Sequence, residues 1–207
     1  MRNVVITGVG IKSCIGNTYQ EVLDSLKNGK SGITADETYK EMCFRSQISG
    51  SVDINLSELI DRKLYRFMGE SAAYAYLAAQ DAIEMAGISE LHLNSERAGI
   101  VAGSGGASTR VMVSTADITR EKGPKRIGPY AVTKSMGSSI SAILATAYKL
   151  KGINYSISSA CATSAHCIGH GADLIKSGHQ DIVIAGGGED LHWSSSSLFD
   201  AMGALSS

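Results

Sequence analysis

The chain has 207 residues, of which 43% are hydrophobic and 19% charged, and its formal net charge is −1 at pH 7. That length can bury a sizeable core in one domain or two small ones. The near-zero charge excludes a global attraction to nucleic acid or anionic membrane. We expect no signal peptide, and none of its apolar runs is long enough to span a bilayer. Its four cysteines lack disulfide-framework spacing, so we expect free thiols in a reducing cytoplasm.

The first third of the chain predicts a strand followed by helices. Residues 3–11 (NVVITGVGI) are mostly apolar, as in a strand covered on both faces. An amphipathic helix should begin near Thr18 and end near Gly29. Residues 33–60 are polar and irregular, with a weak strand over residues 46–54. Residues 61–87 are rich in alanine and predict one long helix, or two joined helices, stopped by Gly87.

The remainder continues the alternation of strands and helices, which predicts an α/β fold. Residues 97–108 form a strand that runs into a glycine-rich loop, and residues 114–130 a helix that ends in a basic loop. Residues 132–150 should be helical and stop at Gly152. A strand over residues 153–158, a helix from Cys161 to Gly178 and a strand over residues 181–188 complete the pattern.

The stretch YSISSACATSAHCIGHG (155–171) holds two cysteines and two histidines. On a helix, Cys161 and Cys167 lie roughly 120° apart, and only Cys167 and His170 share a face. A structural zinc site needs four ligands in closely paired spacing, which nothing here supplies. A redox pair has two residues between its cysteines, whereas five separate these. Neither metal binding nor redox exchange therefore fits the spacing.

Two interpretations of Cys161 remain open from the residues alone. It stands at a strand-to-helix junction, where unsatisfied backbone N–H groups and the helix dipole favour a thiolate and can hold a developing oxyanion. Small neighbours, including Ser159, Ala160 and Ala162, would let a substrate carbonyl approach. The alternative is a small buried hydrophobic residue.

Two glycine-rich stretches raise the possibility of nucleotide binding. The first, VVITGVGIKSCIG (4–16), has Ser13 where a dinucleotide-binding fingerprint needs its third glycine. The second, GSGGAS (103–108), lacks the lysine of a P-loop. A nucleotide-binding oxidoreductase is therefore disfavoured.

Longer segments carry a resemblance to a known family. The sequences SSACATSAHCIGH (158–170) and GGGEDLHW (186–193), continuing into FDAMGALS (199–206), resemble the nucleophile region of type I β-ketoacyl-acyl-carrier-protein synthases. These are bacterial fatty-acid condensing enzymes of the thiolase fold. Further segments match in order at residues 4–17, 31–34, 60–69, 102–108 and 128–136. The resemblance implies a thiolase-like fold, layered α/β with a mixed central sheet, in a cytoplasmic homodimer.

The resemblance also assigns roles to individual residues. Cys161 would accept the acyl chain, and its backbone N–H would form part of the oxyanion hole. Gly105 and Gly106 would lie beside the acyl pocket, and Met136 would cap the tunnel of the neighbouring subunit. Trp193 and Phe199 would line the subunit's own pocket. Candidate docking residues for an acidic acyl carrier protein are Lys63, Arg66, Lys122 and Lys125. The alternatives are core packing for the apolar residues and solvated surface charge for the basic ones.

The second half-reaction, decarboxylation of a malonyl thioester and attack of the resulting carbanion, needs donors that stabilise an enolate. The family takes two histidines and a lysine for this from its C-terminal half, and none of the five histidines here lies in those motifs. We therefore expect residues 1–207 to be the N-terminal half of a synthase, inactive in condensation alone. A type II or polyketide ketosynthase and a non-catalytic partner subunit are the alternatives. No metal or organic cofactor is implied.

Overall fold

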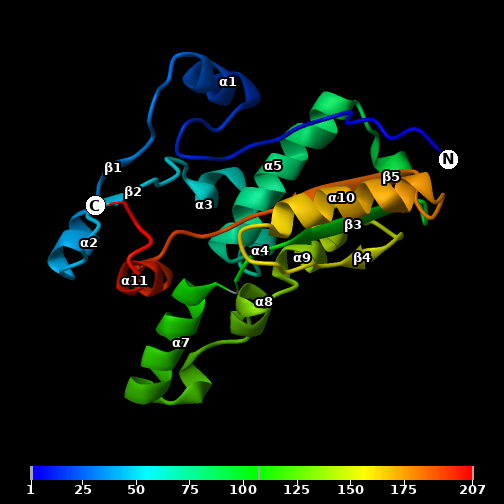
Figure 1. The fold of residues 1–207 in the computed structure, drawn as a ribbon. Coiled ribbons are helices and arrows are strands. Elements are labelled where there is room, and N and C mark those ends of the chain that lie inside the picture. Colours follow the sequence, from blue (N-terminus) through cyan, green and yellow to red (C-terminus); the bar gives the residue numbers. More distant parts are fainter. Residues whose placement is uncertain (1, 107, 207) are drawn as a thin grey trace. The chain divides into compact units, whose positions relative to one another are not determined.

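The computed structural model describes residues 2–106 and 108–206 (Figure 1). The chain divides into two compact units. The first comprises residues 1–10 and 56–190, and the second residues 11–55 and 191–207. Among the described residues, no helix combines the length and the apolar character needed to cross a membrane.

A three-stranded sheet forms the centre of the first unit. Its order is β4 (Asn154–Tyr155), β3 (Ala98–Gly103) and β5 (Ile182–Gly187), with Ile100 opposite both Asn154 and Ile184. Both strand pairs are parallel, whereas the resemblance led us to expect a mixed sheet. Parallel neighbours need long crossover connections, which helices supply here. The predicted α/β class is confirmed.

Helices cover both faces of this sheet (Figure 1). Helix α10 (Thr163–Lys176) packs on β3 and β5, while α9 (Ser139–Ala147) and α5 (Glu70–Ala86) pack on the opposite face. All six residues of β3 are buried, as expected for a central parallel strand. One core cluster joins Val101 of β3 to Cys167 and Leu174 of α10.

The N-terminal segment, residues 3–11, is not a strand, so that prediction is wrong for this chain. Val5 and Ile6 are 73% and 80% exposed, and within the described part of the chain the backbone of residues 3–8 makes no hydrogen bond. A strand needs a neighbour that completes its ladder. The segment instead lies directly on α5, where a Cβ on Gly8 would stand 1.9 Å from the carbonyl oxygen of Ala82. This close approach explains its glycines without a nucleotide.

The alanine-rich stretch forms two helices rather than one. Helix α4 (Arg62–Tyr65) begins at Asp61, whose side chain accepts a hydrogen bond from the Lys63 N–H. Helix α5 follows and ends at Gly87, which has the left-handed conformation (φ 62°) that glycine adopts without steric penalty. The short helices α3 (Leu56–Leu59) and α6 (Glu90–Leu93) flank this pair.

The segment between β3 and β4 is helical and partly extends away from the sheet (Figure 1). It contains α7 (Thr109–Lys122), the 3-10 turn η1 (Pro124–Arg126) and α8 (Ala131–Ser135) before α9. The helix predicted over residues 132–150 is therefore broken. Met136 has an extended backbone (ψ 145°), which ends α8 three residues before α9 begins.

The second unit is smaller. It holds α1 (Tyr19–Lys27), the antiparallel pair β1 (Thr34–Ala35) and β2 (Ile48–Ser49), α2 (Glu37–Glu41) and α11 (Trp193–Ala201). Helix α2 was not predicted, although Asp36 gives it an N-cap. Distant parts of the chain meet within this unit, because the Asp200 carboxylate accepts hydrogen bonds from the backbone N–H groups of Arg45 and Ser46.

Candidate active site

Cys161 lies on a tight turn between β4 and α10. Hydrogen bonds from the Ala162 N–H to Ser159 O and from the Thr163 N–H to Ala160 O, each 3.1 Å long, close the turn. Ala160 has φ +50°, a left-handed conformation that costs an L-residue roughly 1–2 kcal/mol. Thr163 is buried, and its hydroxyl accepts a 2.8 Å hydrogen bond from the Ser159 N–H. Surrounding structure therefore holds a strained backbone directly before the cysteine.

The turn presents the Cys161 thiol in a position suited to a nucleophile. The residue is exposed and precedes the first residue of α10 by two positions. Among the described residues, no group accepts a hydrogen bond from its backbone N–H. An unpaired N–H beside a helix N-terminus can stabilise a developing oxyanion. These features favour the nucleophile interpretation over the buried one.

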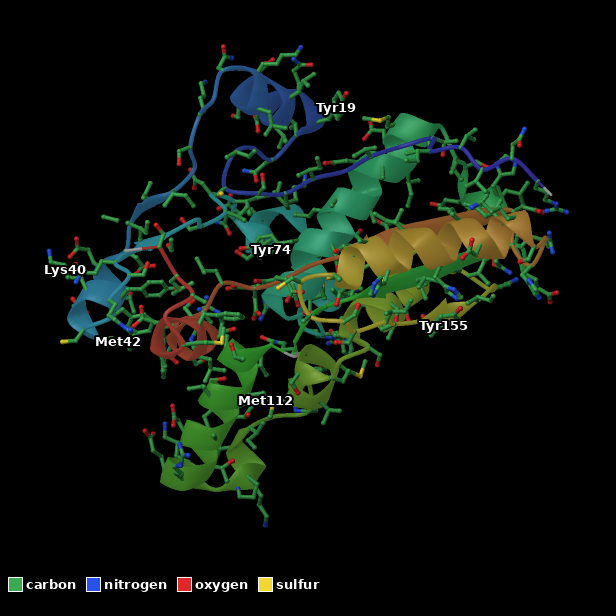
Figure 2. The ribbon with its side chains drawn as sticks, viewed as in Figure 1. Tyr19, Lys40, Met42, Tyr74, Met112 and Tyr155 are labelled. Atoms are coloured by element: carbon green, nitrogen blue, oxygen red, sulfur yellow. The ribbon has the colours of Figure 1, made fainter. Side chains whose placement is uncertain are left out.

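Cys167 has the opposite environment. It is fully buried against Val101 and Leu174, and burial raises the pKa of its thiol. His170 does not pair with it, because its Nε2 is hydrogen-bonded to the hydroxyl of Tyr155, which Figure 2 labels on β4. His166 Nδ1 lies 2.6 Å from Ser159 Oγ. Within the described residues, no three His, Cys, Asp or Glu side chains form a group that could hold a metal ion.

The glycine-rich loop after β3 packs against the turn that carries Cys161, residues 159–163, which we call the nucleophile turn after the candidate role of Cys161. A Cβ on Gly105 would stand 2.8 Å from Ala160 O, and one on Gly103 would stand 2.0 Å from Ile157 O. Gly106 faces open space, because apart from its chain neighbours no atom of the described residues lies within 4 Å of such a Cβ. The two glycines predicted as neighbours of an acyl pocket therefore differ. Gly105 is required by close packing, and only Gly106 borders free space.

A carboxylate holds this loop from its other side. Glu189, two residues after β5, accepts hydrogen bonds from the Gly105 N–H and from Ser104 Oγ, the latter at 2.7 Å. Asp190 accepts a 2.5 Å hydrogen bond from Ser108 Oγ. The Glu189 residue is exposed. The strained backbone of Ala160 and the contact of Ser104 with Glu189 were not predicted, since only a small residue before the cysteine and a serine among glycines mark these positions in the sequence.

A cavity of about 530 Å³ opens between α9 and the strand leading to Cys161. Its lining comes from residues 137, 138, 141 and 142 and from residues 154–156 and 158, with Ser158 three positions before Cys161. Met136 is half-buried and directly precedes this lining. A second cavity of similar size, lined by Asn94 and residues 145–154, includes no candidate site residue.

The four candidate docking residues do not form one patch. Lys63 and Arg66 belong to α4 and its C-cap, while Lys122 and Lys125 lie at the far end of α7 and in η1 (Figure 1). The Arg66 guanidinium lies 5.0 Å from the Phe67 ring centre and 5.3 Å from that of Tyr130. These rings hold an exposed cation in a fixed position.

Trp193 and Phe199 lie on α11 in the second unit. The Trp193 ring is 5.2 Å from that of His192, and Phe199 is 43% exposed. Their predicted place in the acyl pocket stays a prediction.

The comparisons with known proteins agree with this geometry. Residues 1–207 match the family model described as beta-ketoacyl synthase, N-terminal domain. The chain is 56% identical to 3-oxoacyl-[acyl-carrier-protein] synthase 1 of Haemophilus influenzae and 54% identical to that of Escherichia coli K12. All of this chain is covered, but it spans only 51% of either relative's length.

Solved structures give the same fold. A beta-ketoacyl synthase from Burkholderia phymatum superposes with a TM-score of 0.90 at 24% identity, covering 100% of this chain and 51% of that structure. The thiolase-like fold class predicted from the sequence is therefore confirmed. The chain belongs to the beta-ketoacyl synthase family, whose N-terminal domain it matches throughout.

Proposed function

We propose that this chain is the acyl-accepting N-terminal half of a type I β-ketoacyl-acyl-carrier-protein synthase of bacterial fatty-acid elongation. The observation that carries the proposal is the exposed Cys161 thiol, which follows the strained Ala160 and lies two positions before α10. The two relatives at 54% and 56% identity bear the name of synthase 1, which supports type I over the other ketosynthases.

In the first half-reaction, the Cys161 thiolate attacks the carbonyl carbon of an acyl thioester on the carrier protein. A bond forms between Cys161 Sγ and that carbon, and the carbonyl oxygen becomes an oxyanion that the Cys161 N–H can stabilise. Collapse of the intermediate breaks the bond to the carrier's sulfur, and the carrier leaves as a thiolate that takes up a proton. The product is an acyl-Cys161 thioester.

The second half-reaction needs groups outside residues 1–207. A malonyl thioester loses CO2, and its enolate carbon attacks the acyl-Cys161 carbonyl and releases the cysteine thiolate. Histidines of this chain are already engaged locally, since the rings of His92, His166 and His179 contact the hydroxyls of Ser89, Ser159 and Ser177. The remaining half of the relatives' length would supply the enolate-stabilising donors. The unpaired, apolar N-terminal segment also supports a further covering half.

The assembly is a cytoplasmic homodimer that works with acyl carrier protein. Strand β4 is short and forms an outer edge of the sheet, and Tyr155 on it is 39% exposed. A second copy that covered this edge would also cover the cavity lined by Tyr155 and Ser158, and its own Met136 would reach the acyl tunnel there. The carrier protein is acidic, and the fixed Arg66 guanidinium with Lys63 beside it offers it a docking point.

Mass mapping of Cys161 tests the proposal. The chain is incubated with acyl carrier proteins loaded with saturated acyl chains of increasing length, and the peptide around Cys161 is analysed for the acyl mass. We expect acylation at Cys161, none in Cys161→Ala, and no condensation with malonyl carrier protein. Acylation confined to another cysteine, or condensation by the isolated chain, would contradict the proposal.

A further inference from the structure

A chain of three contacting groups leads to Cys161, and the groups come from separate parts of the first unit. Glu189, after β5, holds the Ser104–Gly105 loop after β3, and Gly105 packs on the peptide of Ala160. Ala160 is the residue directly before Cys161 and has φ +50°. We propose that Glu189 is a positioning residue for Cys161, acting through Gly105 and Ala160. The inference deepens the proposed function and rests on it for its role in acyl transfer.

Among the described residues, the hydrogen bonds of Glu189 are made to the loop after β3. One carboxylate oxygen accepts from the Gly105 N–H, and the other lies 2.7 Å from Ser104 Oγ. The single proton of Ser104 Oγ has the Gly106 carbonyl, at 2.5 Å, as its other acceptor. The Glu189 carboxylate is the stronger acceptor of the two for this proton, because it is charged. Because both oxygens of Glu189 bind consecutive loop residues, they fix the loop's position and its orientation.

The loop in turn restricts the nucleophile turn. A Cβ on Gly105 would lie 2.8 Å from Ala160 O and 3.0 Å from Ala160 C, so the two peptides are in direct contact. A left-handed alanine relaxes to φ < 0 unless its surroundings prevent it. Rotation of the Ala160 peptide would carry its carbonyl oxygen, which accepts the Thr163 N–H at 3.1 Å, out of place. The same rotation would redirect the Cys161 N–H and Sγ.

Asp190 provides a matched comparison. It is adjacent to Glu189 in the sequence and also accepts a hydrogen bond from a serine after β3, namely Ser108. Ser108 precedes α7 and is not the loop residue that packs on Ala160. If these carboxylates only anchored the end of β5, both would have the same role. If the role is to position Cys161, it belongs to Glu189 and not to Asp190.

The test measures iodoacetamide labelling of Cys161 in the full 207-residue chain at several pH values, by peptide mass mapping. Exposed Cys43 serves as an internal reference. We expect Glu189→Ala to lower the relative Cys161 rate about three- to tenfold, since one charge-assisted contact pair is lost. Asp190→Ala should leave the relative rate unchanged. Glu189→Gln should recover most of it, because Ser104 Oγ can accept as well as donate.

A second variant separates positioning from folding. Glycine adopts φ +50° without strain, so Ala160→Gly combined with Glu189→Ala should restore the Cys161 rate. If Glu189→Ala does not fold, Ser104→Ala should give a smaller decrease in the same direction. A wild-type rate in Glu189→Ala, an equal decrease in Asp190→Ala, or no recovery in the double variant would overturn the inference. Labelling requires no acyl group, so failure of acyl transfer at Cys161 would be seen separately.

Discussion

Replacing Gly105 by alanine should disturb the nucleophile turn, whereas the same change at Gly106 should not. The added methyl group of Gly105→Ala would lie 2.8 Å from Ala160 O, where ordinary contact begins at 3.4 Å, a shortfall of 3.4 − 2.8 = 0.6 Å. The opposing atoms are backbone, so they cannot rotate aside. Overpacking of this kind costs about 1–3 kcal/mol of unfolding free energy.

Gly106→Ala is the control. Apart from its chain neighbours, no atom in the described part of the chain lies within 4 Å of its Cβ position, and its backbone is outside the left-handed range. We expect its effect to fall between no change and a gain of about 1 kcal/mol, because alanine restricts the unfolded chain.

Thermal unfolding and labelling of Cys161 measure the two consequences of Gly105→Ala. For a chain of this size, each kcal/mol corresponds to about 2–4 °C in Tm. We expect a lower Tm together with a lower Cys161 labelling rate relative to Cys43. A Tm within about 1 °C of wild type for Gly105→Ala, or an equal decrease for Gly106→Ala, would refute the packing argument.

Three further predictions concern other parts of the molecule. Hydrogen bonds from Arg97 and Arg2 lower the pKa of Asp181 to about 2, so its stabilising effect is complete above its unfolded pKa near 3.8 and is lost as the pH falls through about 2. Asp181→Asn should therefore flatten the acid-unfolding curve between those pH values, which circular dichroism would detect. Cys167→Ser places a hydroxyl in a fully buried site and should cost about 1–3 kcal/mol in urea unfolding, whereas exposed Cys161→Ser should be nearly neutral. Arg66→Ala should weaken binding of acyl carrier protein by up to about fivefold at low salt and by less at high salt. Calorimetry measures the Kd, with Lys40→Ala as the control. A wild-type Kd for Arg66→Ala would show that the docking assignment is wrong.

The sequence alone determined the class of fold and singled out Cys161 as the candidate nucleophile. Alternating strand and helix patterns predicted the βαβ unit around β4, α10 and β5, because apolar periodicity is a local property. Glycine at residue 87 marked the end of α5 for the same reason. The spacing of the cysteines was enough to disfavour zinc and redox pairing, and the helix start beside Cys161 was visible in the pattern.

Only the tertiary structure decided which groups surround Cys161. The contact between Glu189 and Gly105 joins residues 84 positions apart, and no local pattern encodes such a pairing. The backbone strain at Ala160 has no sequence signal either, because alanine is not the residue expected at positive φ. The N-terminal segment has a strand's composition, yet a strand forms only where a neighbour completes its hydrogen bonds. Local pattern predicts most elements of the first unit, while long-range contacts decide whether the N-terminal segment pairs and which groups surround Cys161.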